Sequence, residues 1–310
     1  MACFILRALC SVKTLNSTRH VRALHSGRIL LALNPLLKPD ASDFQFPEDA
    51  TSGDPIFKYS SLHSTALPDK YARLHNSSIS IYPGTAAKTI SPLQGQLLQL
   101  LMRMTRPRHV LELGCFMGYS AMAMADGMPE GASLYTCEKD PRAAEYAREL
   151  FIQGGYSSAE QTVQKTVKIE LLEGDAMSSL ELLAKRKLQF DAIFLDADKG
   201  NYINYFNFVL DNDLLSQDGY ILADNVLFRG MVLQSKQITS VPPSPPPSPQ
   251  LQPKANNSKS ELKHQRKNSL QKTARHMDKF NRHVKKDPRV TVVILPVFDG
   301  LSIIMKNRPC

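Results

Sequence analysis

Short apolar segments alternate with amphipathic segments from residue 109 onward. Five apolar segments are rich in leucine, β-branched or aromatic residues, namely 109–114, 133–138, 168–174, 190–198 and 219–225. Between them lie stretches with apolar residues at helical spacing, such as 141–155, which Gly154 and Gly155 end. Because a strand buried on both faces appears as a short continuous apolar run, the pattern predicts an α/β fold with a parallel sheet and helices on both faces.

Two further helices are predicted before this alternation, over residues 69–78 and 91–104. In the second, Ser91 is a suitable N-cap, Pro92 suits the first helical position, and leucines recur at helical spacing. Another helix is predicted after the alternation, over residues 273–287.

The chain ends in two more predicted strands, 289–297 and 300–306. A turn at Asp299 and Gly300 separates them, which is typical of a hairpin. The last strand is therefore predicted to be antiparallel.

Some segments lack any core-forming pattern. Residues 1–39 contain Arg, Ser and Thr without acids, which favours a mitochondrial presequence, with a disordered extension as the alternative. Residues 40–60 are interpreted as an irregular linker. Residues 234–270, with seven prolines in 242–253, are predicted to form a disordered insertion. We therefore expect one domain over 61–310, interrupted by this insertion, in a mitochondrial or otherwise cytoplasmic protein.

The net charge of +9 is unevenly distributed. Residues 1–39 contribute +6 and residues 234–276 contribute +7, which leaves −4 for the rest of the chain. A protein that follows a phosphate backbone carries basic residues on its folded surface, so this distribution argues against a nucleic-acid partner. No apolar run reaches the roughly 18 residues that span a bilayer, so no membrane span is expected. The five cysteines show no CxxC pair, which argues against a disulfide framework and a thiolate zinc site.

Oxygen-bearing side chains follow two of the predicted strands. Asp196 ends one apolar run, and Asp224 and Asn225 end the next, so all three are expected at the same edge of the sheet. Three hard oxygen ligands with room for water suit Mg²⁺, or alternatively Mn²⁺ or Ca²⁺. Lys199 lies three residues beyond the first aspartate. An Asx turn at residues 224–225 is the structural alternative.

A glycine-rich turn follows the strand at 109–114. Gly114 and Gly118 would let the backbone approach a ligand, but the segment is not GxGxxG. Glu112 lies inside the strand end, where it would repel a pyrophosphate and favour a positively charged nucleoside such as S-adenosylmethionine. An ordinary tight turn between strand and helix is the alternative.

Two more strand ends carry candidate cofactor contacts. Glu138 lies 20 residues after Gly118, a spacing that suits a carboxylate accepting ribose hydroxyls. Together with Asp140 it could instead cap the following helix. Asp175 and Ala176 could face an adenine ring, or form a solvated turn.

These residues together resemble a known family, the cation-dependent O-methyltransferases typified by the caffeoyl-CoA and catechol enzymes. Four motifs carry the resemblance: VLELGCFMGYS, FDAIFLDADKGNYINYF, GYILADNVLFRG and DPRVTVVILPVFDGLSI. The resemblance covers about 55–235 and 272–306. It implies a class I S-adenosylmethionine-dependent fold, with a seven-stranded, mostly parallel sheet whose last strand is antiparallel, and a possible homodimer.

The resemblance also implies roles for individual residues. The metal ligands would be Asp196, Asp224 and Asn225. The cofactor contacts would be Ile90, Ser91, Glu112, Gly114, Cys115 through its backbone, Ser120, Glu138, Ala176 and Asp198, beside the Asp175 already considered from its place at a strand end. Tyr205 and Arg229 fall where the family contacts the acceptor. Phe228 and Arg229 depart from the Trp and Asn frequent in plant enzymes, so specificity for a CoA ester does not follow.

The expected reaction is transfer of a methyl group to a hydroxyl of a small phenolic or catechol-like acceptor. Lys199 would accept the proton, although Asp196 could serve as the base instead. The alternative is a nucleotide-binding α/β protein of another class, either an NAD(P)-dependent oxidoreductase or a non-catalytic binding module. An oxidoreductase would have GxGxxG and a Tyr-x-x-x-Lys or His base, and a nucleic-acid methyltransferase would have Asn/Asp-Pro-Pro-Tyr in place of the DADK segment.

Overall fold

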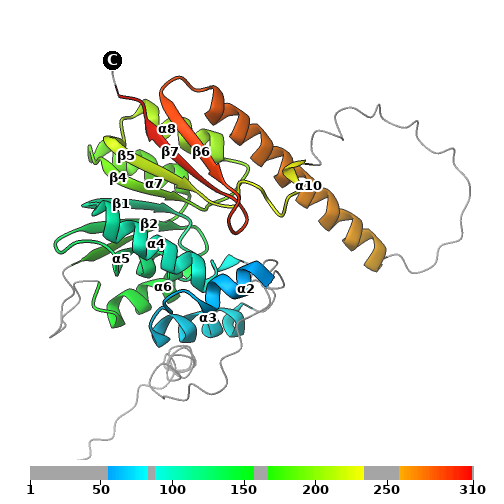
Figure 1. Ribbon diagram of the computed structural model, residues 1–310, viewed down its shortest axis with the longest axis horizontal. Coiled ribbons are helices and arrows are strands. Elements are labelled where there is room, and N and C mark those ends of the chain that lie inside the picture. Colours follow the sequence, from blue (N-terminus) through cyan, green and yellow to red (C-terminus); the bar gives the residue numbers. More distant parts are fainter. Residues whose placement is uncertain (1–54, 83–87, 157–166, 234–257, 309–310) are drawn as a thin grey trace, which may run out of the picture. The chain divides into compact units, whose positions relative to one another are not determined.

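The computed structural model describes residues 55–82, 88–156, 167–233 and 258–308. Seven strands form one sheet in the order β3-β2-β1-β4-β5-β7-β6 (Figure 1). Their bounds are β1 His109–Leu113, β2 Ser133–Glu138, β3 Lys168–Glu173, β4 Phe190–Leu195, β5 Leu215–Ala223, β6 Val290–Leu295 and β7 Leu301–Lys306. The pairs among β1 to β5 are parallel, and β7 runs antiparallel to both β5 and β6. The predicted parallel sheet with an antiparallel last strand is therefore confirmed.

Helices cover both faces of this sheet (Figure 1). Their bounds are α2 Pro55–Leu62, α3 Asp69–Ile81, α4 Pro92–Thr105, α5 Tyr119–Ala125, α6 Pro141–Gln153, α7 Ala176–Lys185, α8 Tyr202–Asp211 and α10 Ser258–Lys286. Ser91 caps α4 as predicted, since its hydroxyl accepts a hydrogen bond from the Gln94 backbone N–H. The predicted helix end at Gly154 is confirmed as well.

The strands are buried on both faces because alternate side chains contact different helices. Residues such as Leu111, Ile193 and Ile221 pack in one core with α7, α8 and α10. Their neighbours along each strand point to the other face. There the Tyr220 hydroxyl lies 2.9 Å from the Thr105 hydroxyl at the end of α4. The continuous apolar runs of the sequence thus reflect a sheet covered on both sides.

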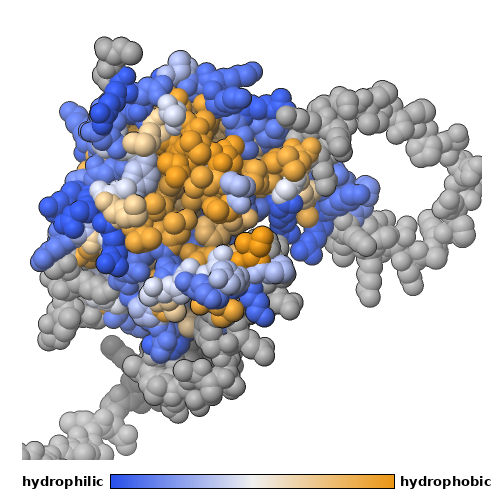
Figure 2. Space-filling model, in the orientation of Figure 1, coloured by the Kyte–Doolittle hydropathy of each residue, from blue (hydrophilic) through white to orange (hydrophobic). Residues whose placement is uncertain are grey.

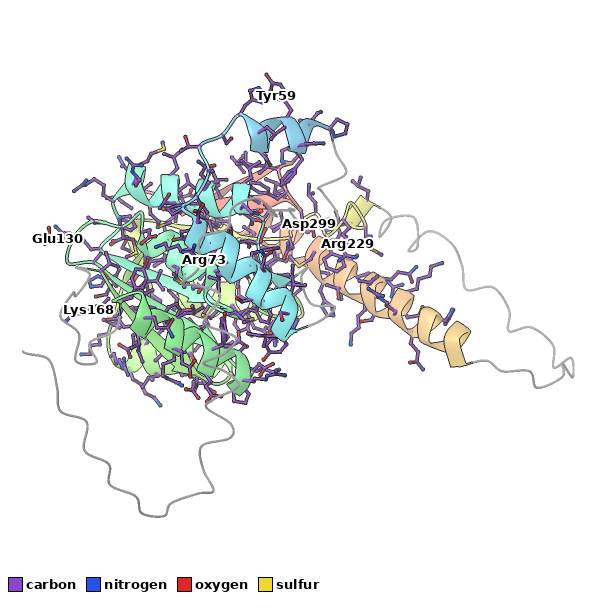
Figure 3. The ribbon with its side chains drawn as sticks, turned by 90° about the horizontal axis from the view of Figure 1, so that it is seen from below. Tyr59, Arg73, Glu130, Lys168, Arg229 and Asp299 are labelled. Atoms are coloured by element: carbon purple, nitrogen blue, oxygen red, sulfur yellow. The ribbon has the colours of Figure 1, made fainter. Side chains whose placement is uncertain are left out.

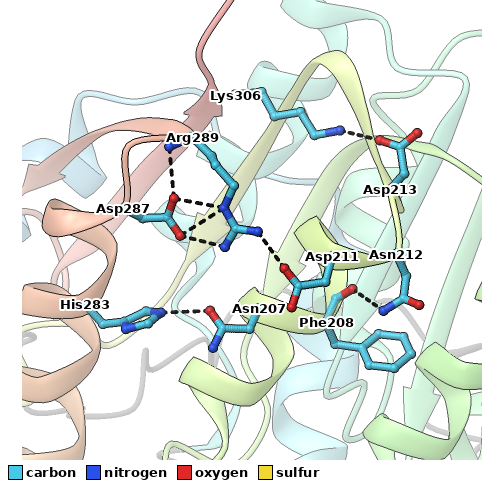
Figure 4. Close-up of polar contacts among 9 residues, drawn as sticks. All are labelled: Asn207, Phe208, Asp211, Asn212, Asp213, His283, Asp287, Arg289 and Lys306. Atoms are coloured by element: carbon cyan, nitrogen blue, oxygen red, sulfur yellow. Dashed lines mark hydrogen bonds and ion pairs between the residues drawn. The ribbon is translucent and has the colours of Figure 1, made fainter.

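Polar contacts attach α10 and β6 to the end of α8 (Figure 4). Arg289 donates hydrogen bonds to Asp287 and, at 2.6 Å, to Asp211. The ring of His283 forms a hydrogen bond of 2.8 Å with the side chain of Asn207. These contacts fix the segment that leads into the last two strands, whose connecting turn borders the site described below.

Two boundaries predicted from the sequence were wrong in part. Residues 55–60 of the predicted linker belong to α2, which starts at a proline and places Phe57 edge-on against Phe298. Residues 258–270 of the predicted insertion belong to α10, because no glycine or proline interrupts this segment and helix-forming residues dominate it. The predictions for residues 1–54 and 234–257 lie outside the described residues. Within the described part, no helix is both long and apolar enough to cross a membrane.

Candidate active site

A cavity of about 1110 Å³ lies at the carboxyl ends of the parallel strands. It is the position where ligands bind in open α/β sheets. Among the predicted site residues, the cavity is lined by Ile90, Ser91, Gly114, Cys115, Ser120, Glu138, Asp175, Ala176, Asp196, Asp198, Lys199, Asp224, Asn225 and Arg229. Glu112 and Tyr205 are not part of its lining. The fold thus brings together residues from six separate segments.

The acidic edge of the cavity is formed by the ends of β4 and β5. The Asp224 backbone N–H donates to the Leu195 carbonyl at 3.0 Å, which continues the pairing of the two strands to this point. Asp224 is buried, and its carboxylate accepts hydrogen bonds from the Asn225 backbone N–H at 2.7 Å and the Gln94 side chain at 2.8 Å. Asn225 adopts a left-handed conformation with φ 57°. Both predicted acids and the asparagine therefore lie at one edge of one cavity.

The donor set fits a hard divalent cation. Burial, and then the charge of Asp196, raise the pKa of Asp224, because two carboxylates share a poorly solvated site. A cation between them would offset this repulsion. In the described part of the chain no three His, Cys, Asp or Glu side chains form a metal-binding group. The predicted set has only two acids and takes its third oxygen from Asn225.

Lys199 is held beside the acidic edge. Its ammonium group donates to Asp196 at 2.6 Å and to the Tyr202 hydroxyl at 2.8 Å. Tyr202 is fully buried and its hydroxyl donates to the Leu195 carbonyl at 2.9 Å. Asp198, the other carboxylate of this segment, makes no ion pair with Lys199 among the described contacts. The lysine thus has a fixed position between an acid and a phenol.

The opposite side of the cavity is formed by the glycine-rich turn and the end of β2. Glu138 accepts hydrogen bonds from the backbone N–H groups of Phe116, at 2.6 Å, and Asp140, at 2.8 Å. This holds its carboxylate at the cavity wall, where further lone pairs can accept hydroxyl groups. Gly114 has φ 101°, and an added Cβ would lie 2.7 Å from the Asp196 carbonyl oxygen. A glycine is therefore needed at position 114 because the backbone at the end of β4 packs closely against it, whether or not a ligand is bound.

Two acids at this side also cap helices. Asp140 accepts hydrogen bonds from the backbone N–H groups of Arg142 and Ala143 at the start of α6. Asp175 accepts one from Met177 at the start of α7. The capping interpretation therefore holds for Asp140, and Asp175 combines a cap with a place on the cavity wall.

Glu112 lies just beneath the cavity and is fully buried. Burial raises the pKa of Glu112 to about 7, although the hydroxyls of Ser120 and Thr136 lower this pKa in part. One carboxylate oxygen accepts a hydrogen bond from Thr136, and the other has no partner of normal geometry within the described structure. A positively charged ligand above this carboxyl would favour its ionised form.

Tyr205 does not contact the cavity as the resemblance had implied. Its ring is buried and its hydroxyl donates to the Asp198 carboxylate at 2.5 Å. Asn201 donates to the other oxygen of Asp198 at 2.7 Å. A direct contact with the acceptor is therefore not supported for Tyr205, whose position indicates that it orients Asp198.

The outer wall of the cavity is apolar apart from Arg229 and Asp299. Leu227, Phe228 and Phe298 supply the apolar part. Figure 3 shows Arg229 and Asp299 close together. The Arg229 backbone N–H donates to the Asp299 carboxylate, and the Leu227 N–H donates to the Asp299 carbonyl at 3.0 Å. The loop after β5 is thus attached to the β6–β7 turn.

Sequence reasoning missed three residues that organise this site. Gln94, Tyr202 and Asp299 each contact a predicted residue or its loop. Tyr202 lies in one of the family-like motifs and Asp299 was noted only as a turn residue. Nothing in the sequence near Gln94 signals a partner 130 residues away.

Comparison with known proteins places this arrangement in a family. The family model for O-methyltransferases matches residues 63–241. The O-methyltransferase ankF of Aspergillus thermomutatus is 31% identical over 263 residues, covering 84% of this chain and 95% of that protein. A catechol O-methyltransferase of Niastella koreensis is 37% identical over 152 residues, covering 48% of this chain and 63% of that protein.

A solved structure supports the same assignment. The SAH-bound methyltransferase PaMTH1 of Podospora anserina is 30% identical, with a TM-score of 0.65 over 85% of this chain and 99% of that one. This likeness decides against the alternatives of an NAD(P)-dependent oxidoreductase and of a non-catalytic module. The chain belongs to the O-methyltransferase family and is an S-adenosylmethionine-dependent O-methyltransferase.

Proposed function

We propose that this enzyme methylates a hydroxyl of a small phenolic or catechol-like acceptor in a reaction that requires a divalent cation. The observation that carries the proposal is the edge of the cavity where Asp196, Asp224 and Asn225 meet beside Lys199. The similarity of this chain to a catechol O-methyltransferase supports a catechol-like acceptor.

The chemical problem is the weak nucleophilicity of a neutral phenol. A phenol has a pKa near 10, so forming the phenolate at pH 7.5 costs about 3–4 kcal/mol. A cation held by Asp196, Asp224 and Asn225 would supply positive charge that favours the phenolate and two-point binding of vicinal hydroxyls. Mg²⁺ is the expected ion, with Mn²⁺ or Ca²⁺ as alternatives.

The residues of the chain supply position and proton transfer. Lys199, held by Asp196 and Tyr202, would accept the phenol proton as a neutral amine, after its ammonium group has released a proton to bulk water. Asp196 is the alternative base. Glu138 and Asp198 are proposed to bind the ribose and the methionine part of the cofactor, from opposite sides of the cavity. The apolar wall of Leu227, Phe228 and Phe298 excludes water from the acceptor.

Methyl transfer from labelled S-adenosylmethionine to a panel of catechols and monophenols tests this proposal. We expect product with Mg²⁺ and at least about a 100-fold loss with EDTA or in Asp224→Asn. Asp218→Asn, an exposed position in the same strand β5, is the matched control and should retain activity. Equal turnover with Mg²⁺ and EDTA would overturn the metal requirement. Absence of product from the whole panel would overturn the acceptor class.

We also propose that the enzyme is a homodimer. Exposed apolar side chains of α4, β6 and β7 form a patch (Figure 2), here called the apolar patch, which consists of Leu100, Met104, Val293 and Met305. Met305 pairs with Tyr220, whose hydroxyl reaches the end of α4, so these side chains share one face of the sheet. In a symmetric dimer the same surface of both subunits lies in contact. Because the apolar patch is uncharged, two copies of it can pack together without repulsion between like charges.

A further inference from the structure

A glutamine from the amino-terminal helices reaches the acidic edge of the active site. Gln94 belongs to the first turn of α4, where its backbone N–H donates to the N-cap hydroxyl of Ser91. Its side-chain amide donates to the Asp224 carboxylate at 2.8 Å. Gln94 and Asp224 are only 5% and 1% exposed, so water competes little for this hydrogen bond.

The contact determines how the carboxylate is oriented. The Asn225 N–H already occupies one oxygen of Asp224, but this donor is the next residue and moves with it. Gln94 holds the second oxygen and comes from a different part of the fold. A carboxylate accepts two hydrogen bonds or metal bonds per oxygen, so both oxygens retain free lone pairs.

We propose that Gln94 is a positioning residue that holds Asp224 in the orientation needed for cation binding. This inference rests on the proposed function, because Asp224 is one of the residues proposed to hold the cation. Residues that hydrogen-bond a metal ligand fix its orientation, and their loss typically weakens metal affinity by about 10- to 100-fold. Since α4 also lines the cavity at its start, the docking of this helix completes the metal-binding edge.

The test is Mn²⁺ binding by the full-length chain, measured by titration calorimetry without cofactor or acceptor. Gln94→Met keeps the length of the side chain and removes the donor. We expect its dissociation constant for Mn²⁺ to rise about 10-fold or more. Gln96→Met is the matched control, because it lies two residues further along α4 and therefore points away from Gln94. The control should stay within about twofold of the wild type, as expected for a residue that does not support a metal ligand.

A second measurement separates positioning from folding. The affinity for S-adenosylhomocysteine should be unchanged in both variants. If Gln94→Met no longer binds S-adenosylhomocysteine, Gln94→Asn replaces it, because asparagine shortens the side chain but keeps it polar. Unchanged Mn²⁺ affinity in a Gln94 variant that binds S-adenosylhomocysteine normally overturns the inference and leaves the proposed function intact. A wild type that binds no Mn²⁺ overturns the metal requirement itself, and the role of Gln94 with it.

Discussion

At the residue scale, the most informative group is a buried acid that makes no contact with the cavity. Glu112 lies one residue before the end of β1, and one of its oxygens has no hydrogen-bond partner of normal geometry within the described structure. Burial raises its pKa to about 7. A carboxyl whose pKa is higher in the folded state stabilises the fold while it is protonated. This contribution is complete below the unfolded pKa of 4.5 and is lost as the pH rises through about 7.

Replacing this acid should therefore change how stability depends on pH. Between pH 5 and pH 8 the free energy of unfolding of the wild type should fall relative to Glu112→Gln by about 2–3 kcal/mol. Urea unfolding of the cofactor-free protein at several pH values measures the difference. Glu170→Gln, in the exposed part of β3, is the control and should run parallel to the wild type. A difference between Glu112→Gln and wild type that does not vary with pH would contradict the raised pKa.

A second acid at the same scale should determine cofactor affinity. Glu138→Gln removes one of the two acceptors that hold the backbone N–H groups of Phe116 and Asp140. Hydrogen bonds to a charged group contribute about 1.5–3 kcal/mol, so the dissociation constant for S-adenosylhomocysteine should rise at least about 10-fold. Calorimetric titration measures it, with Glu173→Gln as control.

Glu173 is the matched position because it pairs with Glu138 across β2 and β3 and ends its strand at the same edge. It is part of an exposed ion pair with Arg148, so its loss should leave cofactor affinity unchanged. If both variants lost the same affinity for S-adenosylhomocysteine, a direct contact of Glu138 with the cofactor would be contradicted, and the negative charge of this edge of the sheet would explain the effect.

At the element scale, the sequence pattern was sufficient for the sheet but not for its surroundings. Apolar runs such as 190–195 identify strands because they are buried on both faces, and Ser91 and Gly154 mark helix ends through local backbone chemistry. The start of α10 at Ser258 was not predicted, because residues 258–272 contain only two apolar residues and show no apolar periodicity, unlike the rest of the helix. The same limit applies to Gln94, whose role depends on which helix lies over which strand end.

The turn between β6 and β7 offers a prediction at this scale. Gly300 has φ 86°, and a Cβ there would lie 2.5 Å from the Leu227 side chain and 2.6 Å from its backbone nitrogen. Gly300→Ala should therefore destabilise the fold by about 2–4 kcal/mol, from backbone strain together with overpacking. It should also raise the Michaelis constant for the acceptor, because the displaced loop carries Leu227 and Phe228.

Gly230 provides the control for this substitution. It also has a positive φ, of 68°, but an added Cβ would meet no atom within 4 Å. Gly230→Ala should therefore cost only the backbone strain, about 1–2 kcal/mol. Thermal and urea unfolding of both variants measure the two costs, and similar values would show that the contact with Leu227 is unimportant.

At the scale of the whole molecule, charge is distributed unevenly along the sequence. The sequence assigns the excess positive charge to residues 1–39 and 234–276, whereas the remainder carries −4. On the described domain, the apolar patch of Leu100, Met104, Val293 and Met305 lies on the sheet face shared with α4 (Figure 2). Surfaces of this kind mark contacts with other proteins, which is the basis for expecting a dimer.

Introducing a charge into the patch should therefore separate the subunits. Met104 is 69% exposed, so Met104→Glu can be accommodated in a monomer but would place two like charges in a symmetric, desolvated contact. Light scattering after size exclusion should give twice the chain mass of 34.6 kDa for the wild type and the single mass for Met104→Glu. Leu182→Glu is the control, because Leu182 is 40% exposed on α7, against the opposite face of the sheet, and its substitution should leave the dimer intact. A wild type that is monomeric at micromolar concentration, or a Met104→Glu variant that remains dimeric, would show that the apolar patch does not join two copies of this chain.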